Sequence, residues 1–253
     1  MQTETIGEVA KKYYELIYKG YHPYIPTGFS DLDNVIRADK GDSIMVTTME
    51  KQPYHYALRL AIPMLYNLAK NGHSVLIDPI SEVSFDILEY LISCECPEIG
   101  RISLHRGTSP DALLKDALER ISELPISIQF NGDAESMTSE IQANKPDVVF
   151  VEGAHVHNRE SLIGSMRALA YRAPFLFIYA TKNRIYDYHA DVILIPEIDT
   201  EDDSPVSEAR IHVPFNKYGL TSDIDITYHY RRALFLPIDE SEERISHEDI
   251  KTE

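Results

Sequence analysis

Short, strongly apolar segments that alternate with helix-length segments limit the fold of this chain more than any other feature. The apolar segments are residues 43–47, 74–78, 147–151 and 175–179. Helical patterns are predicted over residues 56–71, 83–94, 111–124, 138–144 and 159–171. Strands buried on both faces occur in parallel sheets covered by helices, so this order predicts β-α-β crossovers and an α/β fold.

The last third of the chain has a different order. Strand patterns at residues 190–195, 209–214 and 224–230 follow one another without helices between them. A further strand with alternating faces is predicted at residues 126–130. We therefore expect a mostly parallel sheet flanked by helices, with antiparallel strands added at one edge.

Motifs in a fixed order accompany these elements. Residues 25–33 read IPTGFSDLD, 40–42 KGD, 181–184 TKNR, 190–194 ADVIL and 216–221 NKYGLT. In their order and spacing these motifs resemble the C-terminal, RecA-like domain of DnaB-type replicative helicases. The resemblance extends to about Pro237 and implies a RecA-like fold. It also implies a linker helix at residues 1–22, a RecA-like domain at residues 23–238 and an acidic tail at residues 239–253.

The resemblance fails where the phosphate-binding loop should follow the first strand. Such loops need glycines whose N–H groups converge on the anion, a Lys for the phosphates and a Ser or Thr for magnesium. Residues 49–56 read MEKQPYHY, without a glycine. Pro53 removes one N–H donor, and bulky Tyr54 and His55 lie near the Lys and Thr positions. We expect no ATP or magnesium cofactor and a vestigial loop formed by Lys51, Gln52, Pro53, Tyr54 and His55.

The resemblance also implies where the catalytic residues should lie, and these positions are changed. A serine takes the place of the general base, and the neighbouring Glu82 would face the other side of the strand end. The residue that would organise magnesium is Glu152 instead of Asp, and the polar sensor is Thr181 instead of Gln. The Lys and Arg that would reach a neighbour's γ-phosphate correspond to Phe215 and Lys217. The vestigial catalytic positions are therefore Glu82, Glu152, Thr181 and Lys217.

The charge of the chain opposes nucleic-acid binding. It has 24 Lys and Arg residues against 41 Asp and Glu residues, a formal net charge of −17. Binding to nucleic acids depends largely on cations that displace counterions from the phosphates. In the resembled helicases a long basic loop precedes the ADVIL motif, whereas here only residues 185–189 separate Arg184 from Ala190. We expect weak or no DNA binding.

An N-terminal helix is predicted over residues 6–19. Its apolar stripe consists of Ile6, Val9, Tyr13, Leu16 and Ile17. In DnaB-like proteins a linker helix at this place packs on the neighbouring subunit. The resemblance therefore implies an interface that includes Tyr13, Leu16 and Ile17, and a partner that is a RecA-fold or DnaB-type helicase subunit. The alternative is that the helix folds onto its own domain.

A metal centre is not expected. Glu152, His155 and His157 follow one predicted strand and His189 follows another, so a zinc or manganese site remains an alternative.

The chain is expected in the cytoplasm. No apolar run approaches the roughly 18–20 residues that span a bilayer, and the N-terminus lacks the regions of a signal peptide. Two cysteines, Cys94 and Cys96, are expected to be reduced, partly buried thiols.

These observations favour a DnaB-like RecA-fold protein that has lost ATP hydrolysis and acts as a binding or regulatory partner in DNA replication or mobile-element maintenance. One alternative is an active ATPase or helicase with an altered site that uses Lys51, Glu82, Glu152 and Lys217. Another is a small-molecule or metal-binding protein on the same scaffold.

Overall fold

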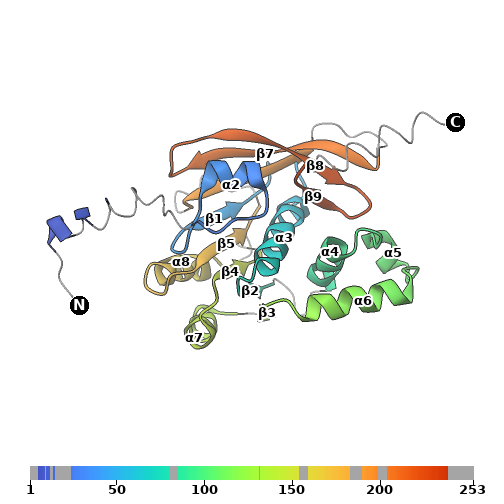
Figure 1. The fold of residues 1–253 in the computed structure, drawn as a ribbon, viewed down its shortest axis with the longest axis horizontal. Helices are drawn as coiled ribbons and strands as arrows, with labels where there is room; N and C mark the ends of the chain where they lie inside the picture. The colour runs from blue at the N-terminus through green and yellow to red at the C-terminus, as the bar shows by residue number, and fades with distance from the viewer. Residues whose placement is uncertain are drawn as a thin grey trace.

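The computed structural model is centred on one mixed sheet (Figure 1). The structure describes residues 5–8, 10, 11, 14, 24–79, 85–130, 132–153, 159–182, 190–198 and 204–238. Within these residues the sheet has nine strands in the order β3-β2-β4-β5-β1-β6-β7-β8-β9. The strands are β1 Ser43–Val46, β2 Val75–Asp78, β3 Ile126–Ile128, β4 Val148–Val151, β5 Leu176–Ala180, β6 Val192–Ile198, β7 Val206–Asn216, β8 Ser222–His229 and β9 Leu234–Leu236.

The strand directions confirm the predicted fold class. Strands β1 to β6 pair in parallel, and β6, β7, β8 and β9 pair antiparallel at one edge. Strands β1, β2, β4 and β5 are fully buried, which explains why their sequences are so strongly apolar. The longest antiparallel strand, β7, has an alternating burial pattern over most of its length, as expected for a sheet with one solvated face.

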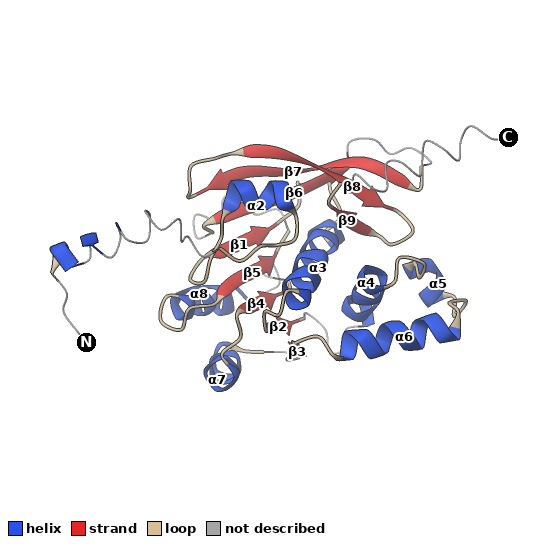
Figure 2. Ribbon diagram, viewed as in Figure 1, coloured by secondary structure: helices blue, strands red, loops and turns tan. Residues whose placement is uncertain are grey.

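Helices cover both faces of the parallel strands (Figure 2). They are α2 Ser30–Ile36, α3 His55–Lys70, α4 Phe85–Glu95, α5 Arg101–His105, α6 Asp111–Ser122, α7 Ala134–Asn144 and α8 Arg159–Ala170. The cluster on one face includes α3 and α4, and the cluster on the other includes α7 and α8. Successive residues of β1 divide between them, because Ile44 and Val46 belong to the first and Met45 to the second.

Three short elements were not predicted, and one helix is longer than expected. Helix α2 begins in the last residues of the first motif and continues to Ile36, and α5 and β9 are too short to give a periodic pattern. Helix α7 begins at Ala134 instead of residue 138. A capping box explains this start, because Asp133 Oδ1 accepts from Ser136 N at 2.8 Å and Asp133 N donates to Ser136 Oγ at 3.0 Å.

The first motif has a structural role. The carboxylate of Asp33 accepts from the Thr27 N–H and hydroxyl, both at 2.7 Å, and from the Gly28 N–H at 3.2 Å. Gly28 has a φ of 85°, and a Cβ at this position would collide with the side chain of Asn67 on α3. The segment is thus folded around one carboxylate and pressed onto α3, which requires glycine.

The N-terminal helix lies mostly outside the described residues. Its described residues have helical backbone, and the side chains of Ile6 and Tyr14 are 85% and 62% exposed. The proposed interface residues Tyr13, Leu16 and Ile17 are among those that the structure does not describe. Among the described helices, none has the length and apolar character needed to cross a membrane.

Candidate functional site

Two predicted site residues, Glu152 and Thr181, lie at the carboxyl ends of neighbouring parallel strands, and Thr48 lies at the end of the next strand. Thr48 follows β1, Glu152 follows β4 and Thr181 follows β5, and all three side chains are buried. The Thr181 N–H donates to Val46 O at 3.0 Å, which holds the ends of β5 and β1 side by side. Parallel α/β folds bind ligands at this edge of the sheet.

The loop from β1 to α3 is closed by hydrogen bonds between its own residues. Met49 N donates to Gln52 Oε1 at 3.0 Å, and Gln52 N donates to Met49 O, also at 3.0 Å. Pro53 has no N–H to offer, and the side chain of Lys51 is exposed. These two N–H groups therefore serve acceptors inside the loop and do not converge on an external anion.

Tyr54 ties this loop to the end of β4. Its hydroxyl accepts a hydrogen bond from Gly153 N at 2.9 Å, and its partly buried ring packs against the core. In phosphate-loop proteins magnesium bridges the loop Ser or Thr and a carboxylate near this strand end. Here a phenol joins the same two segments directly, next to Glu152.

His55, the first residue of α3, carries no charge at neutral pH. Burial, and then the nearby charges of Arg59 and Arg101, lower the pKa of His55 to about 4. A phosphate loop would place a threonine or serine here, after a lysine. Neither Tyr54 nor His55 supplies a cation at the start of α3.

Two buried hydroxyls at this edge have no hydrogen-bond partner among the described residues. They are Thr48 Oγ1 and Thr181 Oγ1, on the ends of the paired strands β1 and β5. An unpaired buried hydroxyl costs about 1–3 kcal/mol. The buried Glu152 carboxylate follows β4, the strand that pairs with β5 on its other side.

Lys217 lies near the amino ends of the parallel strands β1 and β6, opposite to Thr48 and Thr181, and is bound by residues of its own chain. It follows β7, and its Nζ forms an ion pair with Asp42 and lies 3.4 Å from Asp191 Oδ1. The hydroxyl of Tyr218 also donates to Asp42. Burial alone would lower the pKa of Lys217. The hydrogen bond and charge of Asp42 and the charge of Asp191 outweigh burial and raise this pKa. Lys217 can reach a neighbouring subunit only after these ion pairs break, while Phe215 is 45% exposed.

The last motif, like the first, is bonded within the fold. The buried Asn216 side chain donates to Val35 O on α2 at 3.0 Å and to Leu220 O at 2.9 Å. Its Oδ1 accepts from Tyr218 N at 3.0 Å. Asn216 therefore shapes the turn between β7 and β8 and attaches it to α2.

Several predicted site residues lie outside the described residues. They are Glu82, His155, His157 and His189. The structure therefore does not test the general-base substitute or the histidine cluster.

A different group of potential ligands, missed from the sequence, lies between α4 and α5. The ligand atoms of Asp86, Glu89 and His105 lie within 4.8 Å of one another. The Arg101 guanidinium Nη2 lies 2.5 Å from Asp86 Oδ1 and 3.0 Å from Glu89 Oε2. Because the Arg101 guanidinium forms ion pairs with both carboxylates, we interpret the group as an ion-pair network. Its residues come from two helices, so only the packing of α4 on α5 brings them together.

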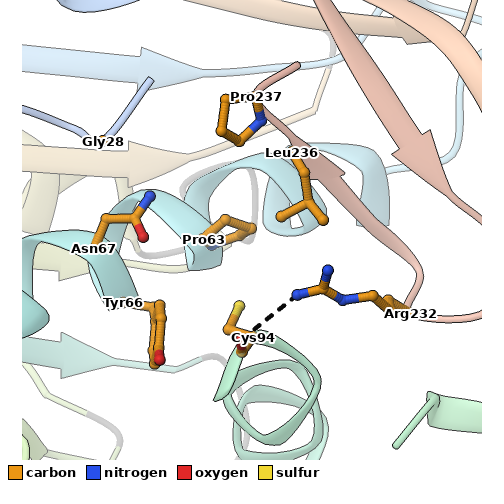
Figure 3. Close-up of a pocket in the computed structure, with 8 residues that line it drawn as sticks. All are labelled: Gly28, Pro63, Tyr66, Asn67, Cys94, Arg232, Leu236 and Pro237. Atoms are coloured by element: carbon orange, nitrogen blue, oxygen red, sulfur yellow. Dashed lines mark hydrogen bonds between the residues drawn. The ribbon is translucent and has the colours of Figure 1, made fainter. Parts of the chain in front are cut away.

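A surface pocket of about 220 Å³ lies on the α3–α4 side (Figure 3). Pro63, Tyr66 and Asn67 of α3 line one wall, and Cys94 of α4 another. Arg232, before β9, donates from Nη2 to Cys94 O at 3.5 Å. Burial, as the main cause, raises the pKa of Cys94 to about 12, so its thiol stays protonated at neutral pH. The pocket adjoins the later turns of α3 and not the loop that precedes it.

Comparisons with known proteins confirm the resemblance at the level of fold. No family model matches the chain, and no curated protein is similar to it in sequence. A solved structure described as an "ATPase Domain" superposes with a TM-score of 0.76 at 14% identity, covering 94% of this chain and 100% of that one. "The Structure Of A DnaB-Like Replicative Helicase And Its Interactions With Primase" superposes with a TM-score of 0.71 at 14% identity, covering 94% of this chain and 68% of that one.

The fold defined by this likeness is that of the RecA-like ATPase domain of DnaB-type helicases. This chain has that fold, with a mostly parallel sheet and antiparallel strands at one edge.

Proposed function

We propose that this chain is a DnaB-like RecA-fold protein without ATP turnover, and that it acts in the cytoplasm as a binding or regulatory partner in DNA replication or mobile-element maintenance. The observation that carries this proposal is the hydrogen bond from Gly153 N to the Tyr54 hydroxyl. It fastens the loop before α3 to the strand end that would carry magnesium. With neutral His55 and an internally bonded loop, the described residues fit a magnesium nucleotide poorly.

The distribution of matched motifs supports the same function. The matched residues Thr27, Gly28, Asp33 and Asn216 make structural contacts within the fold. The positions that differ are those that would touch nucleotide or magnesium. A protein that retains its fold and loses its chemistry has this pattern.

The proposed partner is a RecA-fold or DnaB-type helicase subunit. The surface that we propose for it is the N-terminal helix, with Tyr13, Leu16 and Ile17 at its centre. The exposure of Ile6, which belongs to the apolar stripe, supports this surface, because an apolar side chain left open on a monomer is a candidate for docking.

Calorimetric titration with magnesium-ATP tests the loss of the ATP site. The expected result is no binding tighter than about 1 mM and no phosphate release. Micromolar binding, or turnover that Glu152→Ala abolishes, would establish the opposite.

An active ATPase with an altered site is the second candidate. Two observations favour an active ATPase, because magnesium prefers oxygen ligands. Glu152 has a buried carboxylate, and the hydroxyls of Thr48 and Thr181 have no hydrogen-bond partner among the described residues. Such an ATPase would recruit Lys51, Glu82, Glu152 and Lys217, yet Lys217 is engaged by Asp42 and Asp191. The same titration distinguishes the two candidates.

A further inference from the structure

A single histidine joins three antiparallel strands on the solvated face of the sheet. His212 lies in β7, and its Nε2 is 2.6 Å from Glu197 Oε2 on β6. Its Nδ1 is 2.8 Å from Asp223 Oδ1 on β8. Asp223 is the direct cross-strand partner of His212, and Glu197 lies two residues from the β6 partner, Ile195. The imidazole ring is therefore held between carboxylates of both neighbouring strands.

These two contacts determine which form of the ring fits. An ionised carboxylate only accepts hydrogen bonds, so each ring nitrogen of His212 needs its own N–H to satisfy its partner. The imidazolium has both donors. The neutral ring has one, and it would direct a lone pair at the second carboxylate. The geometry thus matches the protonated ring.

The surrounding charges act in the same direction. On β7, Arg210 Nε donates to Asp225 Oδ1 of β8 at 3.2 Å, and Glu208 lies on the same face. These groups, with Glu197 of β6 and Asp223 of β8, are the charged residues of β6, β7 and β8 near the ring, and carboxylates outnumber cations among them. Burial alone would lower the pKa of His212, but its hydrogen bonds to Asp223 and Glu197 raise it.

A second histidine on the same sheet face provides a contrast. His229, on β8, lies near the hydroxyl of Thr227, with 3.2 Å between Nε2 and Oγ1. Burial, and then the charge of Arg232, lower the pKa of His229 to about 4. His229 therefore remains neutral over the range in which His212 titrates.

We propose that His212 is a proton-operated latch, which holds β8 to β6 through β7 when protonated and releases Asp223 when neutral. Asp223 is the partner released because its side chain is 60% exposed, against 39% for Glu197, and water replaces its hydrogen bond more readily. Asp223 is the second residue of β8, so its release loosens the turn that contains Lys217. This inference does not depend on the proposed function.

The direction of the pH effect follows from the raised pKa. The stabilising contribution is complete below the pKa of an unfolded histidine, about 6.5, and is lost as pH rises through the folded pKa. The equilibrium of the latch changes about tenfold for each unit by which the two pKa values differ.

Two measurements on the full chain test the latch. Nitrogen NMR of the His212 ring between pH 5 and pH 9 should show both nitrogens protonated up to a pH above about 6.5. Amide hydrogen exchange in residues 217–229, corrected for its intrinsic pH dependence, should accelerate several-fold across the same transition. Asp223→Asn should abolish this acceleration, because the neutral ring can accept from the Asn amide. His229→Gln is the matched control and should leave it intact.

Either of two results would overturn the proposal. One is a His212 ring that is already neutral at pH 6. The other is an exchange rate in residues 217–229 that shows the same pH dependence in the natural chain and in Asp223→Asn. The ring measurement needs no variant, so it remains decisive even where a substitution impairs folding.

Discussion

At the scale of single residues, Tyr54 shows how one side chain changes the chemistry of a loop. A lysine near this position would extend a mobile cation toward phosphates, whereas the phenol accepts a hydrogen bond from a main-chain donor on another strand end. Under the proposed function, Tyr54 makes an internal contact at a position where the resembled loop would contact a ligand. The sequence predicts a changed loop at residues 49–56, but the bond to Gly153 depends on a contact between distant segments and could not be foreseen.

Removing the Tyr54 hydroxyl should reduce stability. Tyr54→Phe leaves the ring in the core but deprives the buried Gly153 N–H of its acceptor, which we expect to cost about 1–3 kcal/mol in the free energy of unfolding. Chemical denaturation measures the difference. Tyr171→Phe, at a side chain that is 67% exposed, is the control and should have no measurable effect. Equal stabilities for Tyr54→Phe and the natural chain would show that the bond does not fasten the loop.

At the scale of elements, the order of apolar segments and helices was sufficient to predict the parallel part of the sheet. The central strands are buried on both faces, so burial is visible at every position of the sequence. Helix α2 escaped prediction because its sequence is read equally well as a turn, and only the contacts of Asp33 and the packing of Leu32 and Ile36 define it. The ion pairs of Lys217 join the end of β7 to the starts of β1 and β6, which are far apart in sequence.

Packing of α8 should contribute strongly to stability. Met166 is fully buried in the cluster between α8 and the sheet, so Met166→Ala should lower the free energy of unfolding by about 2–5 kcal/mol. Thermal or chemical denaturation provides the measurement. Lys115→Ala, in an exposed helix pair with Asp111, should change it by less than about 0.5 kcal/mol. A small effect of Met166→Ala would mean that α8 packs loosely on this face.

At the scale of the whole molecule, assembly through the N-terminal helix can be tested directly. We expect a monomer or small oligomer alone, and association with a DnaB-type helicase subunit that the double substitution Leu16→Asp and Ile17→Asp abolishes, because buried apolar anchors dominate such interfaces. Light scattering and circular dichroism measure association and folding. A stable hexamer by itself, or unfolding of the double variant, would assign the helix to a self-assembled ring or to the domain core.

Nucleic-acid binding should be weak for the molecule as a whole. The net charge of −17 repels phosphates. Fluorescence anisotropy with a single-stranded oligonucleotide should show little binding at physiological salt. The affinity should also change little with salt, because each phosphate contact adds about 0.7 to the slope of log affinity against log salt concentration and few contacts are expected. Tight binding with a steep salt dependence would reveal a basic surface that the described residues do not present.

The Lys217 ion pairs and the Tyr54–Gly153 hydrogen bond lie at opposite ends of the parallel strands, so the two ends of the molecule differ. Asp42 and Thr47 flank β1, so roughly 16 Å of extended chain separates the Lys217 network from the loop that Tyr54 closes. A contact between one of these ends and the opposite end of a second copy would be head-to-tail. Such contacts either close into rings or continue as filaments. At one end of the strands the Lys217 cation is bound by Asp42 of the same chain. At the other end the Gly153 N–H is bound by Tyr54 of the same chain. If the proposed function holds, we expect such a subunit to end a row of RecA-like domains and not to extend it.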